Sequence, residues 1–457
     1  MHVLLINIHR SPRALAGYYA SAWAPMPPIS LAYLAAALEQ AGIEVSVYDD
    51  HVGRGDGARL EAAIRAAAPD LVGLSVVTAV AAELPRVTAA VRAAAPKSRI
   101  VAGNIHAQIY HAALLEAGLV DYVVHGEGEV TLVELARALA RPGDDAAHVA
   151  GLSFWRDGHI VETPARPPVE DLDTLPFPAW HKFPMHAYRL LGFARVRDPG
   201  SLILGSRGCP YRCTYCSLAA MTSTRRCRSA VNIADEFEWL LARHGVRQPS
   251  FVDPIFPFDR KEALDFSAEL IRRGLHKEQV WVTETRTDRV DLEMLQAMRE
   301  AGLRRIMFGL EAADADALLR LRKGALADDA VRAVDDCRRA GVEVIGFFML
   351  GVPGATRASM RRDMAYARRL DLDYVKHTVF VPYPGTPIWR ELHAQGELLA
   401  PEDWARYTSY PTFSNPPVYL TKGLSTRDLI AAQAWAHASF YLRPRWLLRH
   451  AFGSRRP

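Results

Sequence analysis

The sequence predicts an α/β protein in which two parallel β-sheet domains follow one another and a helical region ends the chain. Two observations carry this prediction. Short apolar runs alternate with helical patterns over the first 140 residues, and the same alternation resumes at Ser201. Continuous apolar strands separated by helices are typical of parallel sheets whose two faces are covered. The chain of 457 residues is also long enough for two or three domains.

Residues 1–140 are predicted to form a doubly wound, flavodoxin-like parallel sheet. Pro27 and Pro28 precede the best-marked helix and Gly42 follows it, which is the usual asymmetry of helix ends. Ligands of such sheets bind beyond the carboxyl ends of the strands. The expected strands are residues 3–8, 44–48, 71–77, 100–102 and 122–124, and the expected helices are residues 29–40, 58–68, 82–94 and 110–116.

Residues 141–200 are predicted to connect the two sheet domains. A turn at Asp157 and Gly158 separates two apolar runs, which indicates a β-hairpin. Repeated prolines between Pro164 and Pro184 then exclude a regular helix and favour an extended linker.

Residues 201–390 are predicted to form a partial (β/α)6 barrel, because six strand–helix units follow one another. In such barrels the site lies at the carboxyl-terminal mouth of the strands. The expected strands are residues 202–204, 250–253, 280–286, 304–311, 342–350 and 374–381, and the best-marked helices are residues 232–244, 291–301 and 327–340.

Residues 391–457 are predicted to form a helical C-terminal region. Nearby aromatic residues either cap the barrel and contact substrate or form ordinary core. The basic tail carries no acid, and a solvated helix end is favoured over contact with a membrane surface. The aromatic residues are Trp389, Trp404, Tyr407, Tyr410 and Phe413, and the arginines of the tail are Arg443, Arg445, Arg449, Arg455 and Arg456.

The most informative motif is the array Cys209, Cys213 and Cys216 that follows the first strand of the predicted barrel. Thiolates at this spacing suit zinc or an iron–sulfur cluster. Structural zinc prefers four ligands, and the two other cysteines, Cys227 and Cys337, are isolated. Three thiolates on a four-iron cluster would leave one iron open for chemistry.

With Tyr215 just before the third cysteine, the CxxxCxxC array resembles the signature of the radical S-adenosylmethionine (radical SAM) enzymes. The resemblance implies that the three cysteines hold a [4Fe–4S] cluster. It also implies that the open iron binds the amino and carboxylate groups of S-adenosylmethionine. Zinc binding or a chance array is the alternative.

Polar residues at the expected strand ends match the order of the radical SAM pattern. The resemblance assigns Tyr215, Arg286 and Glu311 to binding of S-adenosylmethionine. A carboxylate can pair with amino or hydroxyl groups of the cofactor, and a guanidinium can pair with its carboxylate. The alternative for each residue alone is a structural salt bridge or turn.

The first 140 residues resemble the cobalamin-binding domain that precedes many radical SAM domains, through Pro27-Pro28, "AGxxH" and "GEGE" segments in the same order. One departure is Gly103-Asn104, where the family commonly has two glycines. The alternative is a flavodoxin-like domain with another ligand or none. The resemblance assigns cobalamin contacts to Ser75, Thr78, Gly103, Gly126, Glu127 and Gly128.

The cobalamin loop of the family, DxHxxG, is degraded here to Asn7-x-His9-x-x-Pro12. Without the acid that orients the imidazole, His9 is not expected to bind cobalt. The alternative is that the neutral imidazole does reach the metal.

The resemblance implies a methyltransferase that uses a [4Fe–4S] cluster, S-adenosyl-L-methionine and cobalamin to act on an unactivated carbon of a small molecule or natural-product intermediate. A cobalamin-dependent radical cyclase or ring-rearranging enzyme, similar to the tetrapyrrole cyclases, is the enzymatic alternative. A non-catalytic corrinoid or redox sensor is the alternative of another class.

Composition sets the expected surroundings. The formal net charge of +4 is too small to indicate nucleic acid binding, and no apolar run approaches the ~20 residues of a membrane span. Free thiols and the absence of an export signal predict the cytoplasm. The expected partners are a small-molecule substrate and a low-potential electron donor such as flavodoxin or ferredoxin.

Overall fold

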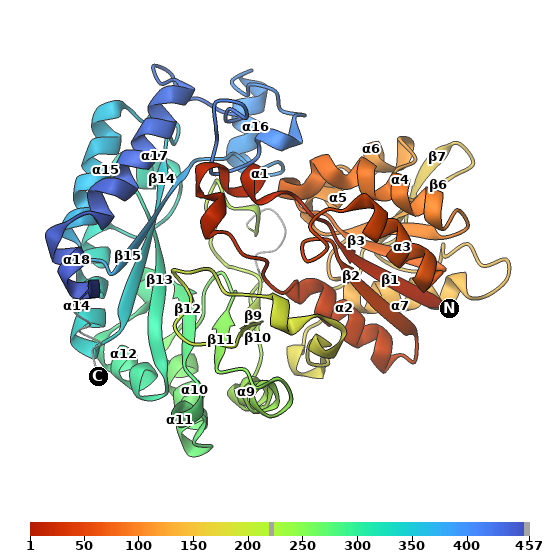
Figure 1. Ribbon diagram of the computed structural model, residues 1–457, viewed down its shortest axis with the longest axis horizontal. Helices are drawn as coiled ribbons and strands as arrows, with labels where there is room; N and C mark the ends of the chain where they lie inside the picture. Colours follow the sequence, from red (N-terminus) through yellow and green to blue (C-terminus); the bar gives the residue numbers. More distant parts are fainter. Residues whose placement is uncertain (219–223, 452–457) are drawn as a thin grey trace. The chain divides into compact units, whose positions relative to one another are not determined.

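The computed structural model describes residues 1–218 and 224–451 (Figure 1). The chain divides into two compact units. The first unit comprises residues 1–15, 24–188 and 402–407, and the second comprises residues 16–23, 189–401 and the chain from Thr408 onward.

The first unit contains a seven-stranded sheet in the order β2-β1-β3-β4-β5-β6-β7. The first five strands are parallel and have the flavodoxin-like order, so this part of the predicted fold is confirmed. The strands are β1 (His2–Asn7), β2 (Glu44–Asp49), β3 (Leu71–Ser75), β4 (Arg99–Gly103), β5 (Tyr122–Val124), β6 (Leu152–Arg156) and β7 (His159–Glu162).

Helices cover both faces of this sheet. One layer holds α2 (Ile29–Gln40) and α7 (Gly128–Leu139), and the other holds α3 (Gly57–Ala67) and α4 (Leu84–Ala94). The predicted helix 82–94 begins within the 3-10 helix η2 (Thr78–Glu83) and continues as α4. The predicted helix 110–116 is α6 (His111–Glu116), and the short helix α5 (Ile105–Ile109) before it was not predicted.

The predicted hairpin is present, but it belongs to the first sheet rather than to a connector. Strand β6 pairs antiparallel with β5, where Val123 lies opposite Ser153. The hairpin turn is a local signal, whereas the free edge of β5 that accepts the hairpin is created only by folding of the sheet. The first unit therefore continues to Tyr188, beyond the predicted end of the first domain at residue 140.

The second unit contains a six-stranded, all-parallel sheet in the order β15-β14-β13-β12-β11-β8, which confirms the predicted partial barrel. The strands are β8 (Gly200–Ile203), β11 (Gln248–Phe251), β12 (Trp281–Thr285), β13 (Leu303–Glu311), β14 (Glu343–Leu350) and β15 (Tyr374–Val379). The helices that connect them are α9 (Ala230–His244), α10 (Arg260–Arg272), α11 (Leu275–Glu278), α12 (Leu292–Glu300), α13 (Ala315–Arg320), α14 (Ala327–Ala340) and α15 (Arg357–Arg369).

The two faces of this sheet carry different side chains. Alternate residues such as Trp281 and Ile306 belong to the large core beneath the helices, which lie outside the sheet in Figure 1. Val282, Met307 and Ile345 form a separate small cluster on the opposite, inner face. The period-2 alternation of strand side chains thus separates the face that packs on the helices from an inner face with its own apolar cluster.

The C-terminal region contains α16 (Pro387–Ala394), η7 (Trp404–Arg406), α17 (Thr426–Tyr441) and α18 (Pro444–Ala451). The aromatic residues expected to cluster are separated. Trp404 packs on His106 and Tyr110 in the first unit, whereas Tyr410 packs on Tyr19 in the second. Their nearness in the sequence does not make them one cluster, because residues 402–407 belong to the first unit and Tyr410 belongs to the second.

The basic end of the chain is partly docked rather than solvated. Arg449 forms ion pairs with Asp371 and Asp373, and Arg445 pairs with Asp371. The acids come from the turn before β15, which the composition of the tail could not reveal. Arg455 and Arg456 lie outside the described residues.

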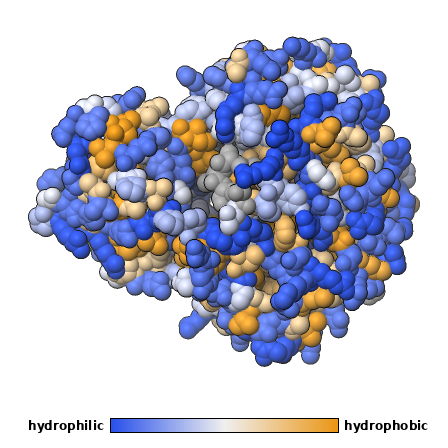
Figure 2. Space-filling model, turned by 180° about the vertical axis from the view of Figure 1, so that it is seen from behind, coloured by the Kyte–Doolittle hydropathy of each residue, from blue (hydrophilic) through white to orange (hydrophobic). Residues whose placement is uncertain are grey.

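No helix among residues 1–218 and 224–451 is long and apolar enough to cross a membrane. The face shown in Figure 2 is mostly hydrophilic, and its hydrophobic side chains occur singly or in small groups.

His377 on β15 should make the second unit sensitive to acid. Its ring stacks on Phe348 and neither ring nitrogen has a partner among the described residues. Burial lowers the pKa of His377 to about 3. In the unfolded chain this residue takes up a proton near pH ~6.5, so its neutral form stabilises the fold fully above that pH and the benefit is lost as the pH falls toward 3.

Urea unfolding of the holoenzyme at pH 7.5 and 5.5 tests this effect. The loss attributable to His377 over this interval is about 1.4 kcal/mol. His377→Phe keeps a flat ring and should lose correspondingly less stability on acidification. Equal acid-induced losses in the two proteins would show that His377 does not control this response.

Candidate active site

The loop that carries the three cysteines begins at the end of β8 and is held by a buried carboxylate. Asp253, just after β11, accepts hydrogen bonds from the backbone N–H of Gly205 at 2.9 Å and from the hydroxyl of Ser206 at 2.6 Å. Burial raises the pKa of Asp253 to about 6, although these hydrogen bonds oppose the shift. Asp253 therefore positions the start of the loop.

The cysteine loop itself is held by backbone hydrogen bonds. The N–H of Thr214 donates to the carbonyl of Leu321 at 3.0 Å, and the N–H of Cys216 donates to the carbonyl of Cys213 at 3.2 Å. Cys213 is buried, whereas Cys209 and Cys216 are partly exposed.

The donor set fits a cluster better than a single ion. Among the described residues, no three His, Cys, Asp or Glu side chains converge on a point where one metal ion could bind. A [4Fe–4S] cluster accepts one thiolate at each of several irons, so its ligands need not converge. Three cysteines outside any disulfide, on one anchored loop, meet that requirement.

A buried polar triad lies beside the cysteine loop. The Tyr215 hydroxyl donates to Glu311 Oε1 at 2.8 Å, and Lys323 Nζ donates to the same oxygen at 2.9 Å. Burial and the charge of Glu311 raise the pKa of Tyr215 well above its ordinary value. Burial lowers the pKa of Lys323, but Glu311 outweighs it and the net shift is upward. The phenol and the ammonium therefore both remain protonated donors.

The backbone at the end of β13 is shaped to present Glu311. Glu311 has a positive φ of 63°, and the register between β13 and β14 shifts between Gly309 and Glu311. A Cβ at Gly309 would lie 2.5 Å from Glu311 Oε1 and 2.8 Å from Lys323 Nζ. A side chain at this position would displace the ion pair from its observed place.

Arg286 is engaged within the protein. Its Nε and Nη2 donate to the carboxylate of Asp288 at 2.8 and 3.0 Å, and Nη1 donates to the carbonyl of Lys323 at 2.7 Å. Its guanidinium also lies 3.7 Å from the ring centroid of Tyr211. Burial lowers the pKa of Arg286, but the hydrogen bonds to Asp288 outweigh it and raise the pKa overall. The structure thus gives Arg286 a role in supporting the Lys323 loop, and its predicted pairing with the cofactor carboxylate stays untested.

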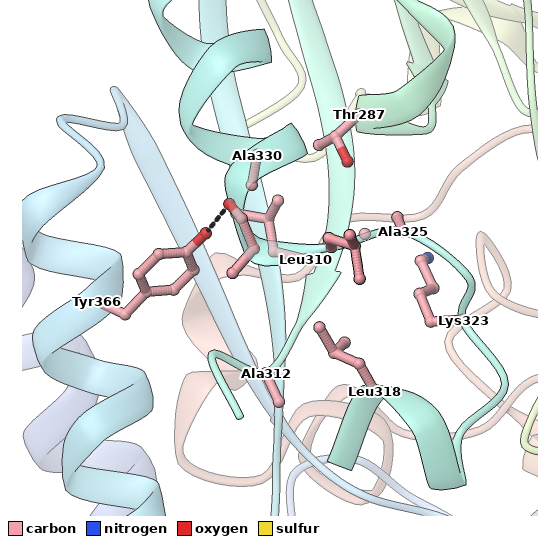
Figure 3. Close-up of a pocket in the computed structure, with 11 residues that line it drawn as sticks. Thr287, Leu310, Ala312, Leu318, Lys323, Ala325, Ala330 and Tyr366 are labelled. Atoms are coloured by element: carbon pink, nitrogen blue, oxygen red, sulfur yellow. Dashed lines mark hydrogen bonds between the residues drawn. The ribbon is translucent and has the colours of Figure 1, made fainter. Parts of the chain in front are cut away.

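Lys323 is the residue that sequence reasoning missed. Lys323 and Glu311 are 12 residues apart in the chain, and no local pattern indicates that they pair. Figure 3 shows the apolar surroundings of the Lys323 loop, where Leu310, Leu318 and Ala330 line a small pocket. Tyr366 closes this region through its hydroxyl, which donates to the carbonyl of Ala327 at 2.8 Å.

The predicted cobalamin contacts lie at the carboxyl ends of three neighbouring strands in the first unit. Ser75 ends β3 and accepts a hydrogen bond from Asn104 at 3.1 Å, and Gly103 ends β4. A Cβ at Gly103 would meet only Val124, at 3.8 Å, and at Gly126 it would meet nothing within 4 Å. Small residues beside open space at this edge fit close approach of a large flat cofactor.

The other predicted cobalamin residues have partners in the protein. Thr78 is buried, and its hydroxyl lies 3.4 Å from Nδ1 of His106. The Glu127 carboxylate accepts the N–H of Val169 at 2.8 Å. A Cβ at Gly128 would lie 3.0 Å from Leu34, so this glycine serves helix packing. Their contacts with cobalamin remain predictions.

His9 lies next to a second histidine, His51. The rings of His9 and His51 are 5.1 Å apart, and burial lowers the pKa of each. Asp49 accepts hydrogen bonds from the N–H of His51 at 2.9 Å and from the hydroxyl of Tyr188 at 2.6 Å. That His9 does not bind cobalt remains a prediction.

Substituting Gly103 by tryptophan is expected to abolish cobalamin binding, because the indole would fill the open space at the end of β4. Equilibrium binding of cobalamin to the purified protein measures the effect. Lys97→Trp is the matched control, since exposed Lys97 precedes the opposite end of the same strand. Unchanged binding by the Gly103 variant would contradict the predicted site.

Comparisons with known families agree with this arrangement. Residues 17–136 match the B12 binding domain family, and residues 203–367 match the radical SAM superfamily. Both matched segments contain the sites described above.

Individual relatives cover most of the chain. An uncharacterized methyltransferase of Pyrococcus horikoshii is 29% identical over 93% of this chain and 90% of its own length. The anaerobic magnesium-protoporphyrin IX monomethyl ester cyclase of Cereibacter sphaeroides is 29% identical over 96% of this chain and 69% of its own. The structure of the radical S-adenosylmethionine methyltransferase TsrM from Kitasatospora setae, with cobalamin and a [4Fe–4S] cluster bound, has a TM-score of 0.73 at 23% identity, covering 97% of this chain and 91% of that one.

The two sites define an enzyme in which a cobalamin-binding sheet accompanies a radical SAM barrel. The chain belongs to the cobalamin-dependent radical SAM enzyme family. Its cofactors are a [4Fe–4S] cluster, S-adenosylmethionine and cobalamin, and the prediction of an enzyme, rather than the alternative of a non-catalytic sensor, is confirmed.

Proposed function

We propose that the enzyme transfers a methyl group from S-adenosylmethionine, by way of cobalamin, to an unactivated carbon of a small molecule. The observation that carries the proposal is the presence of two features in one chain, the anchored cysteine loop beside the Glu311 triad and the open glycine edge of the first sheet. A relative that aligns over 93% of this chain is named as a methyltransferase, which supports the proposal.

The three cofactors supply the radical and methyl-transfer chemistry when they are bound. The protein contributes orientation. We propose that Cys209, Cys213 and Cys216 hold the cluster, and that Glu311 and Tyr215 contact S-adenosylmethionine. The hydrogen bond from Lys323 holds the Glu311 carboxylate beside the cysteine loop, where it can receive the cofactor's amino or hydroxyl groups.

Cobalamin is expected to lie against Ser75, Gly103 and Gly126, where added bulk would exclude it. We also propose a low-potential electron donor such as flavodoxin or ferredoxin, a cytoplasmic location and no nucleic acid partner. These proposals follow from the needs of the cluster and from the charge and thiol content of the chain.

Methyl transfer is tested with S-adenosylmethionine that carries a CD3 group. After anaerobic incubation of the reduced holoenzyme, the corrinoid is extracted and analysed by mass spectrometry. The CD3 label is expected on the corrinoid, and its absence would count against a methyltransferase. The Gly103→Trp variant, which should not retain cobalamin, is the control.

A cyclase is the second candidate, because a relative named as a cyclase aligns over 96% of this chain. With a candidate substrate, a methyltransferase product gains the CD3 label. A cyclase product gains no methyl group and loses hydrogen instead. The mass of the product therefore decides between the two functions.

A further inference from the structure

Two charged side chains on the inner face of the barrel sheet are not used by either site. Glu284 lies on β12 and Lys376 lies on β15. Both are half-buried, and their charged groups have no hydrogen bond or ion pair among the described residues. A buried charge without a partner is costly, so charges that serve only the fold are normally paired.

The register of the strands places both residues on the ligand-facing side. Glu284 lies opposite Met307, a member of the inner cluster. Lys376 lies opposite Phe347, which packs on the same cluster. The side chains between the two charges are therefore apolar, and they lie on the face of the sheet opposite the large core.

Aromatic rings surround the ammonium of Lys376. Its Nζ lies 5.5 Å from the ring centroid of Phe193, 5.6 Å from that of Phe347 and 6.0 Å from that of Tyr410. These distances allow a weak attraction to the ring faces, but an aromatic ring does not neutralise the charge. A bound anion would neutralise the charge of Lys376, and the aromatic rings would flank the organic group that carries the anion.

The electrostatics of the two groups fit an anion-binding site. Burial lowers the pKa of Lys376, and Glu284 only partly offsets it. Burial raises the pKa of Glu284 to about 7, with Lys323 and Lys376 opposing the shift and Glu311 adding to it. The Glu284 carboxyl group can therefore accept or donate a hydrogen bond near neutral pH.

We propose that this inner face is the subsite for the methyl acceptor, and that the acceptor is an organic anion. Its carboxylate, phosphate or phosphonate pairs with Lys376, its apolar body packs on Phe193 and Phe347, and an N–H or O–H group pairs with Glu284. The identity of the ligand as the acceptor rests on the proposed function, whereas the binding of an organic anion at Lys376 does not.

Protection of Lys376 from acetylation tests the subsite directly. The holoenzyme, saturated with S-adenosylmethionine, is treated briefly with acetic anhydride in the presence of 3-phenylpropanoate, 2-phenylethylphosphonate or neutral 3-phenylpropanamide. Peptide mass spectrometry then measures acetylation of Lys376 and of Lys261, whose side chain is 85% exposed. One or both anions should reduce acetylation of Lys376 severalfold, while the amide and Lys261 show no effect.

The comparison between anions shows which oxyanion the subsite prefers. Equal protection by the amide, or no protection by either anion, would overturn the proposal. Protection by S-adenosylmethionine alone, compared with enzyme free of it, would assign Lys376 to that cofactor instead and would also overturn it.

Variants provide the second measurement. Lys376→Met should raise the dissociation constant of the protective anion at least tenfold in equilibrium dialysis, Lys376→Arg should largely retain binding, and Lys261→Met should match the parent. Cluster content and S-adenosylmethionine binding show that each variant is folded. If the CD3 experiment fails in the parent enzyme while anion protection persists, the proposed function is wrong and the anion site stands.

Discussion

Replacing Cys209, Cys213 and Cys216 together by alanine is expected to reduce bound iron from about four atoms per chain to background. The same variant should form no 5′-deoxyadenosine from S-adenosylmethionine. The substitutions remove the thiolate ligands of the cluster. The loop itself should keep its conformation, because backbone hydrogen bonds hold it. Iron analysis, the absorbance of the cluster and product chromatography measure the effect after anaerobic reconstitution.

Cys227→Ala is the matched control for this variant. Cys227 is an exposed free thiol that follows the same loop, yet it lies outside the motif. It should retain full iron content and activity, as should Cys337→Ala in the buried core. A triple variant with as much iron as the parent would remove the basis for the cluster assignment.

Glu311→Ala is expected to weaken binding of S-adenosylmethionine roughly tenfold to a hundredfold, since a charged hydrogen bond contributes about 1.5–3 kcal/mol. Cluster content should remain normal. Glu311→Gln keeps an acceptor for Tyr215 and Lys323 but loses the charge, and its affinity should lie between the two. Equilibrium binding to the reconstituted, unreduced enzyme is the measurement.

The ion pair with Lys323 makes a further control necessary. Glu311→Ala leaves the buried Lys323 ammonium without its carboxylate, and this alone is destabilising. Lys323→Met removes the pair from the other side while Glu311 and its bond from Tyr215 remain. If Glu311 contacts the cofactor, Lys323→Met should weaken binding less than Glu311→Ala. Equal losses in the two variants would mean that Glu311 acts only by holding the Lys323 loop.

The class of the protein could be predicted from the sequence because its signals are local. The cysteine array occupies one loop, and the periodicity of each helix and strand depends on near neighbours along the chain. The parallel sheets of both domains were predicted from the alternation of strands and helices, which restricts such chains to a few topologies. The helix from Ile29 to Gln40 was predicted with its observed bounds because proline and glycine mark its two ends.

The partners of individual side chains were decided only by the tertiary structure. Tyr215 and Glu311 lie 96 residues apart in the chain, and their hydrogen bond exists because β13 ends beside the cysteine loop. The same is true of the hairpin that extends the first sheet and of Arg449, which pairs with acids from another segment. Ion pairs and free sheet edges depend on distances in space, which a linear pattern of residues does not contain. The sequence therefore determined the chemistry available to this enzyme, and folding decided which residues share each site.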